Sequence, residues 1–455
     1  MPTYLNVGAT QIQSWLGRSP DLKGRRGASS MLALATAPAG WDDLPGVSWN
    51  SEAGAVSGVV SLVVADRYEP SDCARRVLAK LRPLLPAAQL SASWAQGDTY
   101  VEAYADMLAM YDEGRGLDSV PAVTENPLAK RCEKCAVGGA INVVTGLPDL
   151  KEGKAPPVVC DDCALRYRHA GHTRRRAEQL APLIERLQQT GSIPDDLGVL
   201  ASVGAHRDRD VATKVAVFYA DGNNVGRFIH AALKEGLPKE RLARIVDDAN
   251  TEAFVLAAET IRQGGFHGVV PHVVAGDDVL VSVSAPLAWS FATTYLSCFG
   301  RKVAEELGDN DAIALPSASG ALVFHHKSSP LAEAVDAAAG LLAGVKDSVS
   351  GPGIAYLDLM SDDPTAGPLV PAMPLGWVEE AVGAAARVAA LPASHRKRML
   401  PYARRAMVDP GAAAGQEELS RMVERSGYEP LNRYLDANRV DVPGLVWALQ
   451  IATDV

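Results

Sequence analysis

Three aspartates lie next to short apolar segments that the sequence predicts to be β-strands. Asp277 and Asp278 belong to an Ala-Gly-Asp-Asp turn inside a predicted hairpin at residues 269–284, and Asp221 directly follows the apolar run 215–220. Mg²⁺ is commonly held by one or two carboxylates together with water and phosphate oxygens. If the two strands are neighbours, the three carboxylates meet at one edge of a sheet and form a site for two divalent ions, Mg²⁺ or Mn²⁺.

The turn alone has a simpler interpretation, because Asp and Gly favour tight turns for conformational reasons. The surrounding pattern favours the metal site. The sequence predicts a strand at 215–220, a helix at 238–263, the hairpin, a helix at 286–307, a strand at 319–325, a helix at 330–346 and a strand at 354–358. The order βαββαβ is the ferredoxin-like plan, whose first and third strands are central neighbours. We therefore expect Asp221 to lie beside Asp277 and Asp278.

Residues around this predicted site are candidates for contact with a nucleotide. Asn223 or Asn224 can donate hydrogen bonds, and the backbone at Gly222 and Gly276 can approach a phosphate closely. Lys346 ends the last predicted helix, where it could neutralise a triphosphate. A lysine in a last helical turn is also favourable because of the helix dipole alone, so both interpretations of Lys346 stay open.

Four of the six cysteines form two CxxC pairs, Cys132 with Cys135 and Cys160 with Cys163, separated by 24 residues. Two such knuckles can close a tetrahedral zinc site. Because four thiolates leave no open coordination position, we expect a structural Zn²⁺. A redox CxxC would normally occur once, beside a βαβ unit. The other two cysteines are interpreted as buried thiols.

Length and composition predict several globular domains of the α+β class. The chain has 455 residues, of which 47% are hydrophobic and 22% charged. We expect a first palm-like domain at 1–117, a zinc module with a connecting basic helix at 118–194, a second palm-like domain at 195–370 and a helical domain at 371–455. In the first domain, the segment 23–27 (Lys-Gly-Arg-Arg-Gly) is typical of a turn.

Charge and hydropathy exclude some classes of protein. The formal net charge of −10 argues against a surface coated by nucleic acid, which needs clustered Lys and Arg. Local basic clusters at 23–26, 166–176 and 396–405 are either solvated helix surfaces or binding patches. No segment has the roughly 18–20 apolar residues that cross a bilayer, and no signal peptide is recognisable. We expect a cytoplasmic protein without membrane contact.

Taken together, these motifs resemble the polymerase-like large subunit of type III CRISPR effector complexes, the two-palm family that makes cyclic oligoadenylates. The likeness covers most of the chain. In that family the first palm carries "GIQ…LKG.RG.S..L", a four-cysteine zinc module lies between the palms, and the second palm reads "DxDNLG", then "GGDD", then "SxG…H…P". The corresponding segments here are Ala9–Gln13 with Leu22–Ser29, the four cysteines, Asp221–Gly226, Ala275–Asp278 and Ser317–Pro330.

The resemblance implies a nucleotidyl cyclase that acts on NTPs, with ATP expected. It implies catalytic Asp221, Asp277 and Asp278, two Mg²⁺ or Mn²⁺ ions, and a CRISPR RNA–protein complex or a phage-derived activator as partner. Two departures bear on activity: Asn223 replaces the second aspartate of "DxDN", and Ala275 replaces the first glycine of "GGDD". No His-Asp dipeptide occurs, so we expect a short form without the family's histidine-aspartate nuclease domain.

The first palm is expected to be a non-catalytic partner that holds the acceptor nucleotide. It has no Gly-Asp-Asp turn, and the strand that we compare with the hairpin ends in Ala65-Asp66. Two other functions stay open. One is a catalytically weak scaffold of an RNA–protein complex, and the other is a GGDEF-like dinucleotide cyclase, whose palms normally pair between two chains. Here two palms could face each other within one chain, so a monomer and a dimer are both compatible.

Overall fold

The computed structural model describes most of the 455 residues. The described residues are 1–19, 21–54, 58–121, 130–144, 155–170, 180–205, 211–308, 313–360, 372–389, 391–408, 413–426, 431, 435–436, 439–440 and 442–454. Among them, no helix combines the length and the apolar character that crossing a membrane requires. The fold is mixed α+β, with two separate palm sheets, as the sequence predicted.

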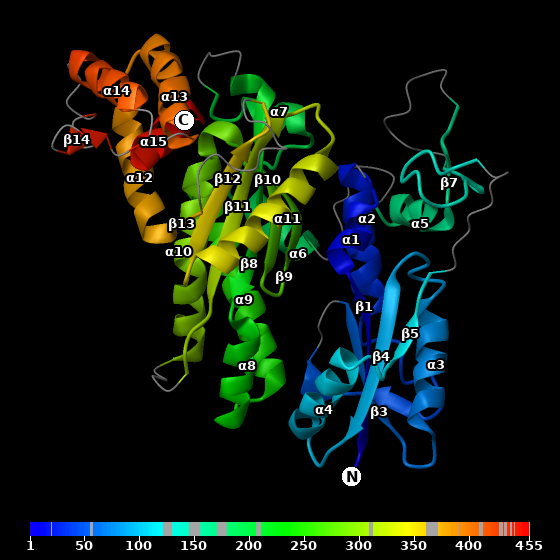
Figure 1. The fold of residues 1–455 in the computed structure, drawn as a ribbon. Coiled ribbons are helices and arrows are strands. Elements are labelled where there is room, and N and C mark those ends of the chain that lie inside the picture. Colours follow the sequence, from blue (N-terminus) through cyan, green and yellow to red (C-terminus); the bar gives the residue numbers. More distant parts are fainter. Residues whose placement is uncertain are drawn as a thin grey trace.

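The second palm is a six-stranded sheet in the middle of the molecule (Figure 1). Its strands are β8 (Lys214–Asn223), β9 (Val269–Ala275), β10 (Asp278–Ser284), β11 (Ser317–His326), β12 (Gly353–Asp358) and β13 (Met373–Pro374). They run in the order β13-β12-β11-β8-β10-β9. The four strands β11-β8-β10-β9 have the 4-1-3-2 order of a ferredoxin-like sheet, which confirms the predicted βαββαβ plan.

Helices cover both faces of this sheet because its strands alternate two sets of apolar side chains. They are α9 (Lys239–Thr260), α10 (Ala288–Leu307, after the short turn η4, Ala285–Leu287) and α11 (Leu331–Ser348), and α8 (Val225–Lys234) packs against α9 beyond the end of the sheet. Ala216 and Phe218 pack with α9 and α10 on one face, whereas Val217 and Tyr219 pack with α11 on the other. Figure 1 shows α11 across the front of the sheet, with α9 and α10 behind it. Helix α8 is an element that the sequence reasoning missed.

The first palm repeats this plan. Its elements are β1 (Thr3–Thr10), α1 (Ile12–Gly17), α2 (Leu22–Ala35), β2 (Val47–Trp49), η1 (Ser51–Ala53), β3 (Val59–Val64), α3 (Pro70–Leu81), β4 (Gln89–Gln96), α4 (Tyr100–Asp112) and β5 (Leu117–Ser119). The sheet order is β2-β3-β1-β4-β5. Strands β2-β3-β1-β4 therefore have the same ferredoxin-like order, and β5 extends the sheet beyond the fourth strand, as β12 and β13 do in the second palm.

The predicted turn at residues 23–27 was wrong, because these residues lie in helix α2. Asp21 caps the helix by accepting a hydrogen bond from the backbone N–H of Gly24 at 2.8 Å. The two glycines serve close packing. A Cβ on Gly27 would lie 1.9 Å from the carbonyl oxygen of Arg166, and one on Gly24 would lie 1.8 Å from Oγ of Ser19. Glycine therefore lets α2 approach its neighbours closely.

The zinc module packs on α2 and is separate from both sheets (Figure 1). Its strands β6 (Asn142–Val143) and β7 (Val158–Val159) pair and lead into α5 (Asp161–His169). Within 118–194, the region predicted to hold a connecting basic helix, the described residues form two helices, α5 and α6 (Ala181–Gln188), and residues 171–179 lie outside the described part. Helix α7 (Leu197–Ser202) and the turn η3 (Val211–Thr213) then enter the second palm.

One arginine in each of two basic clusters, Arg25 and Arg166, is buried, whereas Arg168 of the second cluster is exposed. Arg166 is fully buried, and it bonds Oδ2 of Asp162 at 2.7 Å and the carbonyl oxygens of Trp15 and Leu16 at 2.6 and 3.2 Å. The Arg166–Asp162 pair therefore ties the zinc module to the end of α1.

The C-terminal part is helical, as predicted. It contains α12 (Leu375–Val388), α13 (Ala393–Val408), α14 (Ala413–Ser426) and α15 (Val442–Asp454), with a short hairpin of β14 (Leu435–Asp436) and β15 (Arg439–Val440). Trp447 on α15 makes edge-to-face contacts with Trp289 and Tyr356 of the second palm, with ring centroids 5.2 and 4.8 Å apart. This helical part thus shares a core with the second palm.

The two palms touch where α9 begins. Lys239 donates a hydrogen bond to the hydroxyl of Tyr100 at 3.1 Å, and its ammonium lies 3.6 Å from the ring centroid of Tyr104. Burial lowers the pKa of Lys239 to about 8. A Cβ on Gly54 would come within 3.2 Å of Glu240, so the backbones are close here. A cation held by two aromatic rings thus joins α9 to α4.

Candidate active site and zinc cluster

The three predicted aspartates come together at one end of the β8–β10 strand pair. Val279 pairs with Ala220 across these antiparallel strands, so the next position in the register sets Asp278 opposite Asp221. Asp277 occupies the two-residue turn between β9 and β10, where Gly276 has a φ of 59°. The arrangement agrees with the neighbouring strands that the sequence predicted.

Asp277 packs against the carboxylate of Asp221. A Cβ on Gly222 would lie 2.7 Å from Oδ2 of Asp277, so glycine at 222 leaves room for this carboxylate. Burial, and then the negative charge of Asp221, raise the pKa of Asp277 to about 6. Carboxylates at such short range repel one another when all are ionised. A divalent cation relieves this repulsion, so the donor set fits Mg²⁺ or Mn²⁺.

Helix α9 holds the turn from behind. The amide of the fully buried Asn250 donates to the carbonyl oxygens of Gly276 at 2.9 Å and Asp278 at 3.2 Å, and its oxygen accepts from the hydroxyl of Tyr295 at 2.9 Å. The carboxylate of Asp247 accepts from the N–H of Gly276 at 2.7 Å. The sequence reasoning missed these residues. The available signal was the position of Asn250 on the otherwise apolar face of α9.

Lys346 reaches the same site from the last turn of α11. Its ammonium forms an ion pair with Oδ2 of Asp221 and donates to the carbonyl oxygen of Gly222 at 2.9 Å. About a third of each side chain in the pair is exposed, 30% for Lys346 and 34% for Asp221. The ammonium is therefore accessible to a ligand that enters at the carboxylates.

Asn223 and Asn224 have different surroundings. The amide nitrogen of Asn223 donates to Oγ of Ser317 at 3.1 Å, Oγ of Ser319 at 2.8 Å and the carbonyl oxygen of Gly351 at 3.1 Å. Asn223 thus joins β8 to β11 and to the loop before β12. Asn224 is exposed, has a φ of 60° and makes no capping bond to α8.

In the first palm, neither of the two strand ends that correspond to this edge carries a carboxylate, although Asp112 and Asp118 line a cavity with Thr10. In the second palm that edge is the end of the first strand and the start of the third. In the first palm these positions are Thr10 and Val59, whereas Asp66 follows the opposite end of β3. The comparison of Ala65-Asp66 with the Asp-Asp turn was therefore wrong in position. The sequence of this palm contains no Gly-Asp-Asp segment, as noted above.

Three histidines of the second palm lie in strands: His272 in β9, and His325 and His326 in β11. His272 is buried and shares a hydrogen bond of 2.7 Å with Oγ of Ser282. His325 is fully buried, and burial lowers the pKa of its imidazole to about 4. Its neighbour His326 ends β11.

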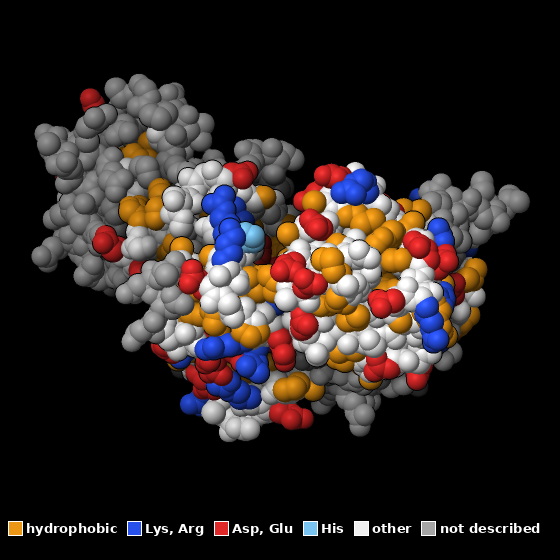
Figure 2. All heavy atoms as spheres, turned by 90° about the horizontal axis from the view of Figure 1, so that it is seen from below, with side chains coloured by type: hydrophobic (Ala, Val, Ile, Leu, Met, Phe, Trp, Pro, Cys, Tyr) orange, Lys and Arg blue, Asp and Glu red, His pale blue; other side chains and the backbone are white. Residues whose placement is uncertain are grey.

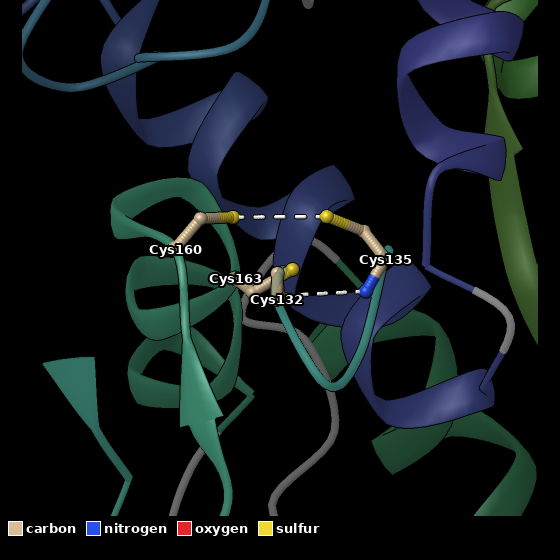
Figure 3. A group of neighbouring side chains, drawn as sticks. All are labelled: Cys132, Cys135, Cys160 and Cys163. Carbon is tan, nitrogen blue, oxygen red and sulfur yellow. Dashed lines mark hydrogen bonds between the residues drawn. The ribbon is translucent and has the colours of Figure 1, made fainter. Parts of the chain in front are cut away.

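The four cysteines of the two CxxC pairs form one cluster (Figure 3). All four sulfur atoms lie within 4.8 Å of one another, and those of Cys135 and Cys160 are 3.7 Å apart. A tetrahedral Zn²⁺ with Zn–S bonds of about 2.3 Å would separate its sulfurs by about 3.8 Å. The cluster can therefore hold one zinc ion. The two cysteines outside it, Cys73 and Cys298, are buried and free.

The groups around the cluster favour thiolates. The backbone N–H groups of Lys134 and Cys135 point at Sγ of Cys132 at 3.4 and 3.5 Å, and the guanidinium of Arg18 lies 4.0 Å from Sγ of Cys135. Contacts among the four thiols lower the pKa of Cys132 and Cys135 and raise the pKa of Cys160 and Cys163, so the four groups share protons when no metal is bound. Such outer contacts orient thiolate ligands and offset their charge.

Comparison with known proteins identifies the type of the second palm and finds solved structures with a similar fold. Residues 214–350 match the family model of the Cas10/Cmr2 second palm domain. The fold is similar to the Csm1–Csm4 cassette in complex with pppApApA (TM-score 0.59, 12% identity), to the cassette in complex with AMPPNP (0.57, 14%) and to Csm1 of T. onnurineus (0.57, 12%). Each alignment covers 100% of this chain and 69% of the solved chain. None of the curated proteins matches the chain.

Proposed function

The chain is Cas10-like, with a second palm of the Cas10/Cmr2 type at residues 214–350, and from this premise we propose that it is a nucleotidyl cyclase that makes a cyclic oligonucleotide from ATP. The choice of adenine is supported by structurally similar cassettes that are in complex with cA4, with cA3 and with one ATP. The product would act as a second messenger in prokaryotic anti-phage defence.

The observation that carries the proposal is the meeting of Asp221, Asp277 and Asp278 at the β8–β10 edge. Asp221 and Asp278 would hold both divalent ions, and Asp277 would share one. When bound, these ions neutralise phosphate oxygens and lower the pKa of the attacking hydroxyl. Asn250 and Asp247 keep the turn in place, so the carboxylates are positioned before the substrate binds.

The reaction proposed is attack of a 3′-hydroxyl on an α-phosphorus. A new oxygen–phosphorus bond forms, the bond from this phosphorus to pyrophosphate breaks, and pyrophosphate leaves with the electron pair while the hydroxyl proton passes to solvent. Catalysis of this kind consists mainly of positioning and charge neutralisation. Lys346 would move its ammonium from Asp221 to the triphosphate, and the backbone at Gly222 and Gly276 would face phosphate oxygens.

The sequence made Asn223 and Asn224 alternative hydrogen-bond donors to the nucleotide, and we propose a different role for each. Because the amide of Asn223 already donates to Ser317, Ser319 and Gly351, we assign Asn223 to holding the strand ends together. Asn224 is exposed and keeps its side chain available for the nucleotide. The four cysteines would hold a structural Zn²⁺ that has no part in the reaction.

The partners we propose are ATP and a type III CRISPR RNA–protein complex, because similar solved structures are Csm1–Csm4 cassettes. A phage-derived activator remains the alternative trigger. The two palms of one chain already touch through Lys239, so the function requires no second copy.

The test is incubation of the purified protein with mixed NTPs and Mg²⁺ or Mn²⁺, followed by mass spectrometry of the products. We expect a cyclic oligoadenylate that is lost in Asp277→Asn and Asp278→Asn. Asp347→Asn, which removes an exposed carboxylate one residue after Lys346, should keep the activity. Absence of product in the wild type, with its activating complex present, would refute the proposal. A dinucleotide product would select the GGDEF-like alternative.

A second candidate is a catalytically weak scaffold of an RNA–protein complex. The observation that favours it is Asn223, whose engaged amide supplies no charge to a metal ion. Recovery of RNA and partner subunits with the chain, together with no nucleotide turnover, would select this function.

A further inference from the structure

Helix α8 carries a stripe of basic side chains on one face. Arg227, His230 and Lys234 are spaced by three and four residues and are all exposed. Residues so spaced lie on the same side of a helix. The opposite side is apolar, where Phe228 and Ala232 are buried against the second palm. We call Arg227, His230 and Lys234 the α8 stripe.

The α8 stripe has no acidic partner. Within the described part of the chain, none of its three side chains forms an ion pair or a side-chain hydrogen bond. Exposed cations elsewhere do find carboxylates: Arg75 pairs with Asp72, Arg186 with Glu252 and Lys302 with Glu305. Within the described residues, Arg241 and Arg244 on α9 are also exposed without an ion pair, so what distinguishes the stripe is its position on the helix that follows Asp221.

The stripe starts beside the candidate active site. Arg227 lies six residues after Asp221, in the first turn of the helix that leaves the end of β8. Helix α8 projects from the lower end of the second palm (Figure 1). Viewed from below, Lys and Arg side chains form a line with one histidine beside it, next to the hollow in the middle of the molecule (Figure 2).

The length of the stripe indicates its ligand. Seven residues at 1.5 Å each separate Arg227 from Lys234 by about 10 Å along the helix. Neighbouring phosphates of a linear single strand lie further apart than the axial rise of about 3.4 Å per phosphate in a duplex strand, so this distance spans roughly two to three phosphates. Glu235 follows Lys234 directly, and the next exposed cations, Arg241 and Arg244, lie on α9. The three cations of the stripe therefore suit a short phosphate chain.

We propose that the α8 stripe binds the phosphate backbone of a short linear oligonucleotide and retains it at the second palm between successive additions. This inference rests on the proposed function, because the oligonucleotide that the stripe would bind is the one that the carboxylate site would extend. Retention would set the length of the product: a chain released early stays short, and one held by the stripe receives further nucleotides before it closes.

The first test measures binding without turnover. Fluorescence anisotropy with labelled linear triadenylate, in Ca²⁺ and at several salt concentrations, would compare wild type with Arg227→Gln/His230→Gln/Lys234→Gln. Glutamine keeps helix propensity and polarity. We expect at least about tenfold weaker binding at low salt, and a salt slope reduced by about 1.4, since single strands give about 0.7 per lost charge and two full charges are lost.

The matched control is Arg67→Gln/Arg75→Gln, which removes two exposed charges from the far side of the first palm. It should leave binding unchanged. Unaltered triadenylate affinity in the stripe variant would overturn the proposal. So would a loss of affinity confined to a 30-nucleotide RNA, because the stripe would then serve a different class of ligand.

The second test measures products. In the wild-type assay with ATP, the stripe variant should release shorter linear products and less of the cyclic one, while the rate of first pyrophosphate release changes less than twofold. An unchanged distribution of products in an active variant would refute the inference and leave the proposed function intact. Absence of any product in wild type would instead refute the proposed function, and the binding test would still decide the role of the stripe.

Discussion

Asn223→Asp is the substitution that separates the two roles considered for position 223. It restores the carboxylate expected from the motif "DxDN", but it removes the N–H donors that now bond Ser317, Ser319 and Gly351. The hydroxyls can turn to donate to the new carboxylate. The carbonyl oxygen of Gly351 cannot, and would face a negative charge. We therefore expect Asn223→Asp to destabilise the metal-free second palm.

The magnitude follows from the number of hydrogen bonds. The amide nitrogen has two hydrogens, and each net hydrogen bond contributes about 1 kcal/mol, so the loss is about 2 kcal/mol. Repulsion from Asp221, two residues away on the same strand face, acts in the same direction. For a domain of roughly 150–250 residues, 2 kcal/mol lowers Tm by about 4–8 °C.

The assay is thermal unfolding in EDTA and in saturating Mn²⁺. In EDTA we expect the full decrease in Tm. In Mn²⁺ the difference from wild type should shrink or reverse, because the added carboxylate increases the ligand charge and binding stabilises the folded state. Asn224→Asp is the control, since Asn224 carries the same amide one residue later, exposed and without a capping bond. An equal Tm for Asn223→Asp and wild type in EDTA would refute the assignment of Asn223 to the strand ends.

Three further predictions concern packing, zinc and pH. Gly27→Ala should lower the free energy of unfolding in urea by at least about 3 kcal/mol, because its Cβ would lie 1.9 Å from a backbone oxygen. The control Gly340→Ala has open space around its Cβ and should raise the free energy of unfolding by up to about 1 kcal/mol. Equal effects of the two substitutions would contradict the close approach of α2 and α5. Cys135→Ser should lower zinc content, measured by mass spectrometry of the metal, from one ion per chain to well below one, and retention of a full ion would refute the four-cysteine site. The pKa of His325 is lowered to about 4 by burial, so the unfolded chain takes up a proton near pH 6.5 before the folded one does, and stability falls as pH drops from 6.5 to 4 by up to about 3 kcal/mol. The free energy of unfolding of His325→Gln should fall less than that of wild type between pH 6.5 and 4. If the two plots of unfolding free energy against pH run parallel, another group causes the pH dependence.

The strand order of the second palm could be predicted because apolar runs and turn residues are local signals. The predicted hairpin at 269–284, with Gly276 and Asp277 in its turn, supplied the second and third strands of a βαββαβ fold. In the structure, the register of β8 and β10 sets Asp278 opposite Asp221. Helix α8 was missed because the segment 222–226 was read only as a phosphate-binding loop. Its apolar face is short, with only Phe228 and Ala232 buried.

The groups that hold the site could not be predicted in the same way, since their roles depend on tertiary contacts. Asn250 is 26 residues from Gly276, which it holds. The segment 23–27 looked like a turn because glycine and arginine are common in exposed loops. In the folded chain, Gly27 meets the backbone of Arg166, and Arg166 itself is buried. The local sequence does not distinguish a glycine that permits a backbone turn from a glycine that permits close packing of another segment.

The contact between the palms has a consequence for how activity depends on dilution. Lys239 holds α9 to Tyr100 and Tyr104, so both palms stay together on one polypeptide. Two sites on one chain meet at an effective concentration set by their tether and independent of the bulk solution. A reaction that uses both palms should therefore be first order in protein, with the same turnover per chain at nanomolar and micromolar concentration. An enzyme that assembles its palms from two separate chains would lose turnover on dilution.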